Sequence, residues 1–362
     1  MRTHGGRGAR AQGGAGARLA RRRVRDGDRG RPPRPRRCGG LGILTARPAF
    51  GLAVLAALLA GCGAPASEAG PPTRAGSLPV FEAELFYQAV GAGEPVVVVH
   101  GGPGLDHSYL RPWFGPLAKT HQVIFYDQRG LGASRAVVNA ASLSMERYLT
   151  DIDRIREHVA QRERVTLLAH SWGAIPALLY AMERPERLTA IILVAPVEPG
   201  SRFREQTDEN QLARRDSADL AAIDSIRGTP EFAEREAEAI SRVFFHVFRG
   251  TFADAGVADS LLRLSLHERT ASQGQLVATL LMTPLQGLDF WDRLGEIEVP
   301  VLIVHGAQDP IPMEMVEAMD EALPDSRLIR VDGSGHFPFI ERPAPFWAGV
   351  REFLRQRPRE GP

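Results

Sequence analysis

One serine of the chain lies where its hydroxyl could act as a nucleophile. Residues 165–174 read VTLLAHSWGA, so Ser171 lies where a continuous apolar run ends and a helical pattern begins. A serine on a sharp strand-to-helix turn projects its hydroxyl clear of the backbone. Small residues two positions away on either side, here Ala169 and Gly173, let the two elements pack closely. The pattern predicts Ser171 as the nucleophile of an acyl-transfer reaction.

A histidine is needed as well, because a serine hydroxyl is a poor nucleophile until a base removes its proton. Of the ten histidines, His336 stands out. It lies in the glycine-rich stretch GSGHFP, residues 333–338, directly after the last expected strand. A flexible turn there can bring an imidazole to the end of a sheet, whereas His170 is expected to point away from its neighbour Ser171. We predict His336 as the general base.

The base in turn needs a carboxylate to orient it. Asp309, in HGAQDP, follows the strand before the one that leads to His336. For a nucleophile on such a turn, the acid follows the serine and precedes the histidine in chain order. A buried Asp309 could accept the Nδ1–H of the imidazole and stabilise the imidazolium. The alternative is a turn aspartate before Pro310, with Asp332 and Glu198 as further candidates for the acid.

A glycine-rich loop follows the run VVVV. Residues 100–104 read HGGPG, and adjacent glycines let a backbone approach a substrate carbonyl and direct N–H groups at an oxyanion. We assign Gly102, together with the backbone N–H of Trp172, to an oxyanion hole. Because no lysine follows the glycines, the loop is not a phosphate loop.

A second glycine-rich segment follows another expected strand. Residues 127–134 read DQRGLGAS, a composition typical of a tight turn. Asp127 and Arg129 carry opposite charges and are able to pair. We interpret the segment as structural support rather than as part of the chemistry.

The elements that must position these residues alternate in type. From Leu78 onward, short apolar runs alternate with amphipathic ones, which is typical of a parallel sheet flanked by helices. Continuous apolar runs indicate strands buried on both faces. They cover residues 96–100, 123–126, 165–168, 191–194, 301–304 and 328–331, and helical patterns cover 110–118, 144–159, 172–184, 313–323 and 343–356. Residues 81–89 could form an opening antiparallel strand or hairpin. The pattern predicts an α/β fold with a mostly parallel sheet.

The alternation stops over residues 200–286, which are polar, charged and helix-forming. Apolar residues recur there at helical spacing, as in the segment 240–248. We predict a helical cap inserted into one hydrolase core, which the cap divides into residues 78–199 and 287–357. A separate partner-binding domain is the alternative.

The N-terminus has a composition of its own. Residues 51–60 form an apolar core that is too short to span a bilayer but suits a signal peptide. The following LAGC resembles the bacterial lipoprotein box, in which the cysteine is lipidated. We therefore predict that residues 1–61 are removed, that Cys62 carries a lipid and that residues 62–77 form a tether. The protein would then be exported and anchored in a bacterial membrane on its periplasmic or cell-surface side; an ordinary secretory peptide is the alternative.

Charge is distributed unevenly. Residues 1–37 hold thirteen Arg and two Asp, which could be a basic arm, an extended signal region or a start codon assigned too far upstream. Residues 63–362 hold 30 basic and 41 acidic side chains. This acidic part is a poor electrostatic match for nucleic acid. We expect a small peptide or ester as the substrate and no nucleic-acid partner.

Five motifs occur in a fixed order: HGGPG, DQRGLGAS, AHSWGA, HGAQDP and GSGHFPF. Together they resemble the proline iminopeptidase branch of the α/β-hydrolases over about residues 78–199 and 287–357. HGGPG combined with a tryptophan directly after the serine is the most specific part. The resemblance implies Ser171, Asp309 and His336 as a triad, the HGGPG loop in the oxyanion hole, and release of an N-terminal residue, often proline, from small peptides without a metal or cofactor.

The cap departs from that resemblance. Family peptidases hold the free amine of the substrate with acidic cap residues, commonly near a Trp- and Glu-containing motif, and residues 200–285 contain no Trp. The candidate carboxylates are Glu205, Glu209, Glu234, Glu236 and Glu238. The alternatives to an aminopeptidase are a carboxylesterase, lactonase or amidase with the same triad, and a non-catalytic lipid-anchored binding protein.

Overall fold

The computed structural model of the chain describes residues 71–162, 164–259, 268–285 and 287–356. The predicted signal peptide, the lipidation of Cys62 and the first part of the tether lie outside these ranges and stay predictions. Within them, no helix has the length and apolar character that crossing a bilayer requires.

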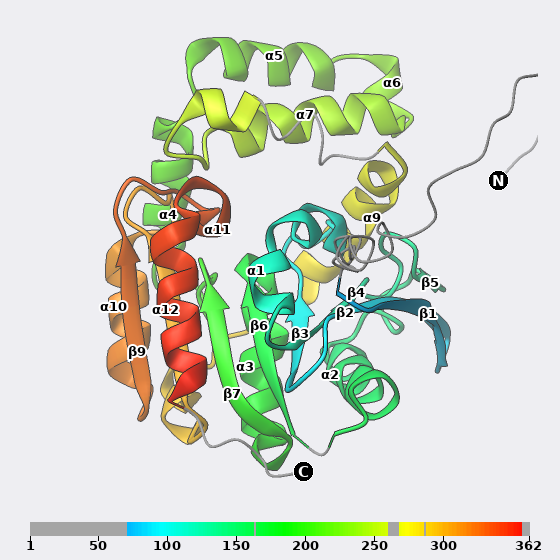
Figure 1. Ribbon diagram of the computed structural model, residues 1–362. Helices are drawn as coiled ribbons and strands as arrows, with labels where there is room; N and C mark the ends of the chain where they lie inside the picture. Colours follow the sequence, from blue (N-terminus) through cyan, green and yellow to red (C-terminus); the bar gives the residue numbers. More distant parts are fainter. Residues whose placement is uncertain (1–70, 163, 260–267, 286, 357–362) are drawn as a thin grey trace, which may run out of the picture. The chain divides into compact units, whose positions relative to one another are not determined.

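A central sheet organises the described chain. Its strands follow the order β1-β2-β4-β3-β6-β7-β8-β9, and the short β5 pairs with β2 (Figure 1). The bounds are β1 (Thr73–Val80), β2 (Ala83–Val90), β3 (Pro95–Val99), β4 (Gln122–Tyr126), β5 (Arg135–Ala136), β6 (Val165–His170), β7 (Leu188–Val194), β8 (Val301–Gly306) and β9 (Ser326–Val331). In the order of the sheet, each pair of neighbouring strands from β4 through β3, β6, β7 and β8 to β9 is parallel. Strand β2 pairs antiparallel with β1, β4 and β5. The predicted α/β fold with a mostly parallel sheet is confirmed.

The sheet begins with a hairpin. Strand β1 pairs with β2 along its whole length, from Thr73 opposite Val90 to Val80 opposite Ala83. Residues 73–77, expected as the end of the tether, therefore belong to a strand. Their small and polar side chains gave no apolar run because β1 is an edge strand with most of these residues exposed.

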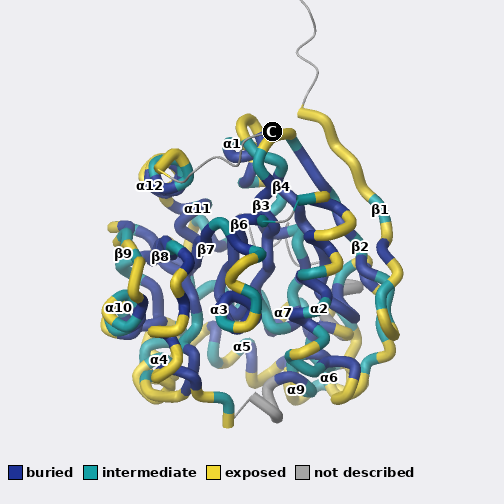
Figure 2. Tube along the Cα trace, turned by 90° about the horizontal axis from the view of Figure 1, so that it is seen from below, coloured by how far each residue is buried: buried dark blue, intermediate teal, exposed yellow. Residues whose placement is uncertain are grey.

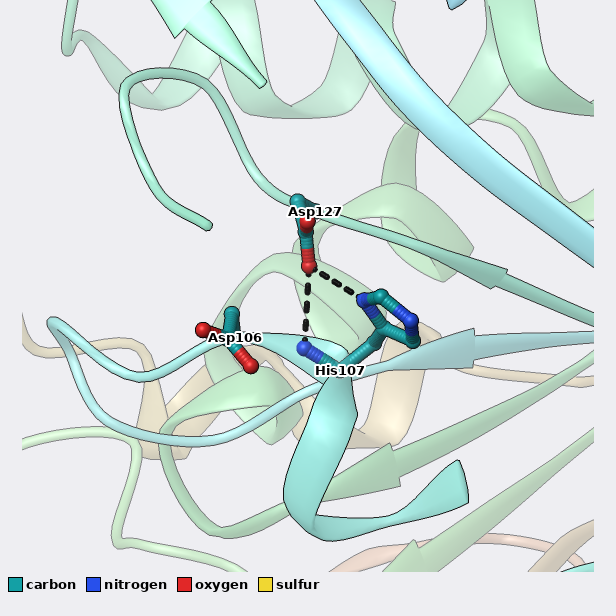
Figure 3. Close-up of side chains that lie close together, drawn as sticks. All are labelled: Asp106, His107 and Asp127. Carbon is teal, nitrogen blue, oxygen red and sulfur yellow. Dashed lines mark hydrogen bonds and ion pairs between the residues drawn. The ribbon is translucent and has the colours of Figure 1, made fainter. Parts of the chain in front are cut away.

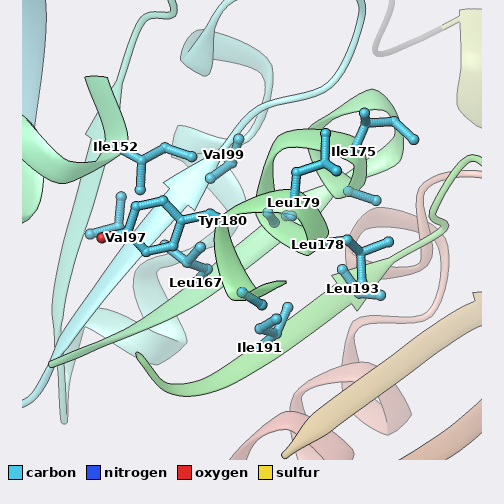
Figure 4. Packing of buried hydrophobic residues seen from close by; sticks show 14 of the residues in the cluster. Val97, Val99, Ile152, Leu167, Ile175, Leu178, Leu179, Tyr180, Ile191 and Leu193 are labelled. Atoms are coloured by element: carbon cyan, nitrogen blue, oxygen red, sulfur yellow. The ribbon is translucent and has the colours of Figure 1, made fainter. Parts of the chain in front are cut away.

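Alternate residues of the central strands face two separate cores. Val97 and Val99 of β3 belong to the core on one face of the sheet, together with residues of helices α2, α3 and α10. Figure 4 shows these two valines near Ile152 of α2 and Tyr180 of α3. Val96 and Val98 pack with α1 and α12 on the other face. The bounds are α1 (Gly115–Ala118), α2 (Met145–Ile155), α3 (Ala174–Glu183), α10 (Met313–Ala322) and α12 (Pro343–Arg355). Burial on both faces explains the continuous apolar runs, and Figure 2 shows these strands as the most buried part.

One expected helix is interrupted. Residues 110–118 form a short 3-10 turn, η2 (Arg111–Trp113), and then the four-residue α1. Pro112 and Pro116 lie in the first turn of each. Proline lacks the N–H that a helix interior needs but is accepted at a helix start. The two prolines therefore divide the segment.

Between β7 and β8, the described residues outside the connecting loops form helices only. These are α4 (Arg204–Ala213), α5 (Ser217–Arg227), α6 (Pro230–Ala233), α7 (Ala237–Arg249), α9 (Glu268–Leu285) and a 3-10 helix, η6 (Trp291–Glu296). Helices α5, α6 and α7 contact one another and lie together in Figure 1, around a small core that includes Ile223, Ile226 and Val243. The N–H of Phe290 donates to the carbonyl of Pro199 at 2.9 Å, so the two ends of this segment meet.

A buried ion pair supports the turn after β4. Arg129 donates from Nε and Nη2 to the two carboxylate oxygens of Asp151 on α2, at 2.7 Å each, and from Nη1 to the carbonyl of Ser142. The pairing of Arg129 with Asp127, which the sequence allowed, is not formed, because Arg129 binds Asp151 instead. The turn directs the guanidinium toward α2, whereas Asp127 accepts a hydrogen bond from His107.

We expect Asp151→Ala to destabilise the fold by about 3–5 kcal/mol, because it leaves the buried Arg129 guanidinium without its counter-charge. Replacing both partners, Arg129→Met with Asp151→Leu, should recover part of this loss. Urea unfolding measures both changes. Glu296→Ala, which breaks an exposed pair with Arg293, is the control and should leave the midpoint nearly unchanged. Equal losses in the single and double variants would contradict the prediction.

Candidate active site

Ser171 lies on a strained turn between β6 and α3. Its φ is 53°, in the left-handed region, where a residue other than glycine costs of the order of 1–3 kcal/mol. A 3-10 turn, η4 (Ser171–Gly173), connects the strand to the helix. At Gly173 a Cβ would collide with the backbone carbonyl of Val99 on β3. Only glycine therefore lets α3 begin this close to the sheet, and Ser171 is held at the carboxyl end of β6.

His336 and Asp309 form a buried pair. His336 Nδ1 donates to Asp309 Oδ2 at 2.8 Å, and the aspartate side chain has no exposed surface. Asp309 Oδ1 accepts the N–H of Ile311 at 2.9 Å. Burial alone would raise the pKa of Asp309, but the charge of His336 and these hydrogen bonds outweigh it and hold the pKa below its ordinary value. The aspartate is therefore ionised and fixes the imidazole orientation.

This pairing also sets the tautomer of the base. Since Nδ1 of His336 carries the proton given to Asp309, Nε2 is the nitrogen that can accept a proton. Among the described residues, no hydrogen bond joins Ser171 Oγ to His336 Nε2. Catalytic hydrogen bonds of this kind often tighten only when substrate binds. The rings of His336 and His170 lie 4.9 Å apart, so the base lies beside the residue that precedes the serine.

His170 has a structural role: its hydrogen bonds connect two loops, and it does not act as the base. Its Nδ1 accepts from the hydroxyl of Tyr109 at 2.7 Å, and its Nε2 donates to the carbonyl of His336 at 3.0 Å. The same Tyr109 oxygen accepts the N–H of Gly101 at 2.7 Å. Burial, together with the nearby His336, lowers the pKa of His170 to about 3. A neutral His170 therefore links the HGGPG loop to the loop of the base.

Gln128 links the HGGPG loop to Trp172. Its side-chain amide donates to the carbonyl of His100 at 2.7 Å, and its Oε1 accepts the indole N–H of Trp172 at 3.3 Å. Its backbone N–H donates to Nε2 of the buried His100 at 3.0 Å. The Gln128 side chain thus bonds both to the HGGPG loop and to Trp172, the two segments that supply the predicted oxyanion hole. Gly102, at φ 133°, has the backbone freedom that such a loop requires.

A cavity of about 260 Å³ adjoins this loop. Gly102 and Trp172 line it, and its core side is apolar, with Ile175, Leu288 and Ile311. The cavity is of a size to hold a small substrate group, and it lies next to both predicted oxyanion residues.

Another part of the cavity lining is polar. It is formed by one face of α4, with Arg204, Thr207, Asp208 and Gln211, and by Glu198 after β7. Two hydrogen bonds fix α4 over the site. They join Glu198 Oε2 to the N–H of Phe203 at 2.8 Å and Asn210 Nδ2 to the carbonyl of Pro310 at 3.0 Å.

The family model of the α/β-hydrolase fold matches residues 94–343, which is most of the chain and includes every element of the site. The chain belongs to the α/β-hydrolase family. It is therefore a hydrolase, and the resemblance predicted from the five motifs is confirmed.

Proline iminopeptidases and esterases are among the proteins to which this hydrolase is similar. A proline iminopeptidase of Clostridioides difficile (strain 630) is 26% identical over 289 residues, which cover 77% of this chain and 97% of that protein. The structure of a proline iminopeptidase of Mycobacterium smegmatis matches with a TM-score of 0.58 at 22% identity, covering 78% of this chain and 98% of that one. A thermophilic esterase of Thermogutta terrifontis matches with a TM-score of 0.55 at 25% identity, covering 76% and 94%.

A second cluster of ionisable groups in the hydrolase has a structural explanation. His107 donates to Asp127 Oδ1 from Nδ1 at 2.6 Å and from its backbone N–H at 3.0 Å (Figure 3). The other oxygen of Asp127 accepts the N–H of Ala133 at 2.8 Å, and Asp106 accepts that of Ser108 at 2.8 Å. Backbone N–H groups therefore already engage both carboxylates, and the cluster holds two turns together.

The other carboxylate candidates lie elsewhere. Asp332 is exposed and pairs with Arg330, so it is no rival to Asp309. The five acidic residues named as candidates for holding a substrate amine are all exposed and do not line the cavity: Glu205, Glu209, Glu234, Glu236 and Glu238. Asp208 and Glu198 line it instead. Helical phase decides this difference, since the face of α4 that lines the cavity carries Asp208, itself exposed, but neither Glu205 nor Glu209.

The pH dependence of stability tests the buried neutral His170. Its pKa is about 3 in the folded state and about 6.5 when unfolded, so the unfolded state binds the extra proton between these values. Stability therefore falls as pH drops through this window. From pH 7 to 4.5 the wild type should lose about 2–3 kcal/mol more than His170→Gln, measured by urea unfolding. The exposed His158→Gln is the control and should follow the wild type. Parallel curves for wild type and His170→Gln would refute the assignment.

Proposed function

We propose that this chain is a serine hydrolase in which Ser171 is the nucleophile, His336 the general base and Asp309 the acid that orients the base. The buried 2.8 Å contact between His336 Nδ1 and Asp309 Oδ2, next to a serine on a strained turn, is the observation that carries the proposal. Such a pair is what a serine hydroxyl needs to become nucleophilic.

The proposed reaction is acyl transfer. His336 Nε2 takes the proton of Ser171 as Oγ attacks an ester or amide carbonyl, and the backbone N–H groups of Gly102 and Trp172 stabilise the oxyanion. The negative charge of Asp309 stabilises the imidazolium. The imidazolium then protonates the leaving group, and a water molecule activated by His336 hydrolyses the acyl-enzyme.

Ser171→Ala is expected to lower kcat by a factor of about 10⁴ or more, because the acyl-enzyme can no longer form. Hydrolysis of arylamides and esters by purified protein gives the rate, and labelling with a fluorophosphonate probe reports the nucleophile directly. Ser217→Ala, which changes an exposed serine of the cap, is the control. An unchanged rate in Ser171→Ala, or labelling that persists, would exclude Ser171. A wild type that neither turns over nor labels would favour a non-catalytic binding protein.

The preferred substrate in this proposal is a small peptide from which the N-terminal residue is released, with no metal or cofactor. The cavity beside the oxyanion loop has a volume that suits one small side chain, such as proline or alanine. Asp208 and Glu198 bring two carboxylates to its wall, which favours a substrate with a free ammonium group. The similarity to proline iminopeptidases supports the same substrate class.

An esterase is the second candidate, on two observations. The core side of the cavity is apolar, as an acyl chain prefers. Arg204 lies one helical turn before Asp208 on the same wall and opposes the binding of a cation.

Asp208→Asn should distinguish these candidates. With an aminopeptidase we expect KM for prolyl or alanyl arylamides to rise about tenfold, because a carboxylate that binds the ammonium is lost. Hydrolysis of short acyl esters should change little. Glu209→Gln, on the same helix but outside the cavity, is the matched control. A preference for esters, or equal rates with a blocked substrate amine, would reject the aminopeptidase.

From the sequence of the N-terminus alone, we further propose that the mature enzyme begins at a lipidated Cys62 and acts outside the cytoplasm. The apolar run over residues 51–60 and the LAGC box support this proposal.

A further inference from the structure

We propose that Glu341 is a positioning residue that holds the loop of the base against the cap, so that the cap contributes to the placement of His336. The inference rests on the proposed roles of Ser171 and His336. It adds a residue that contacts neither substrate nor reacting atoms.

Glu341 joins two segments that are far apart in the sequence. It lies at the end of the short helix α11 (Pro338–Glu341). One carboxylate oxygen, Oε1, accepts the N–H of Ala253 at 2.7 Å, in the cap segment that follows α7. The other, Oε2, accepts the N–H of Gly335 at 2.8 Å and the hydroxyl of Ser334 at 3.2 Å. One side chain thus connects the cap to the two residues before the base.

The cap segment also contacts the backbone of the base itself. The N–H of His336 donates to the carbonyl of Thr251 at 2.9 Å. A Cβ on Gly335 would collide with this same carbonyl and lie 2.9 Å from the N–H of Ala253. The loop of the base and residues 251–253 are therefore in direct backbone contact, with no space for a side chain between them.

Aromatic packing strengthens the same contact. The ring of Phe252 stacks on that of Phe337, with centroids 4.6 Å apart and planes at 21°, and Phe252 is buried. Phe252 follows α7 closely, and α7 carries Arg249, which binds Asp216 and Asp219 of the cap. A displacement of α7 would consequently move residues 251–253, and with them the carbonyl that holds His336.

The chemistry of the site requires a carboxylate. Three donors converge on the buried Glu341, and an ionised carboxylate accepts all of them without offering a hydrogen of its own. Glutamine has nearly the same shape, but its NH₂ group would face an N–H on one side. Glu341→Gln therefore breaks the connection on one side while keeping the packing.

We expect Glu341→Gln to lower kcat about 10- to 100-fold and to leave KM within about twofold, since a misplaced base slows chemistry but not substrate binding. The rate of fluorophosphonate labelling of Ser171 should fall by the same factor. The cap-side variant Phe252→Ala should lower both rates in the same manner. Glu352→Gln, which changes an exposed carboxylate on α12, is the matched control and should keep wild-type rates.

Circular dichroism and unfolding midpoints establish that the variants are folded under the assay conditions. Wild-type kcat and labelling rate in folded Glu341→Gln, or an effect confined to KM, would overturn the inference. If Glu341→Gln fails to fold, Phe252→Ala alone decides: unchanged kcat and labelling would reject the contact with the cap. Failure of the proposed function is recognised separately, because the wild-type Ser171 would then not react with the probe.

Discussion

The left-handed backbone of Ser171 is the constraint on which the site depends. A residue in this conformation persists only where its surroundings leave no alternative. Here β6 is buried along its length, and Gly173 brings the start of α3 against the carbonyl groups of β3. Because β3 also carries the HGGPG loop, the packing that holds the serine turn fixes the distance between the serine and the predicted oxyanion loop.

Buried neutral histidines connect the loops at the carboxyl end of the sheet. His100, His170 and His305 lie at the ends of β3, β6 and β8, and burial lowers the pKa of each. A neutral imidazole donates on one side and accepts on the other, so it can join two loops without placing a charge near the reaction. His170 illustrates this, since its Nδ1 accepts from the hydroxyl of Tyr109 and its Nε2 donates to the carbonyl of His336.

The sequence was sufficient to predict Ser171, Asp309 and His336 as candidates, because each follows an apolar run and the ends of parallel strands meet at one edge of the sheet. The residues that connect them were missed. His170 bonds to a carbonyl 166 positions away and Glu341 to an N–H 88 positions away, and no local pattern reports such distances. The same limit explains why the sequence did not reveal the partner of Arg129, since Asp151 is 22 residues distant rather than two. On α4, spacing alone did not reveal which side faces the cavity.

The hydrogen bond between Phe290 and Pro199 closes the cap segment at its base. A segment whose two ends meet can be lengthened, shortened or exchanged without changing the register of the strands beside it, and closing a longer loop costs little additional entropy. Helices α5 to α7 share a small core of their own, whereas α4 and residues 251–253, which follow α7, are bonded to the hydrolase core. Changes on the outer side of α5 to α7 can therefore leave the sheet in place, whereas changes that move the end of α7 also move the contacts of residues 251–253 with the loop of the base.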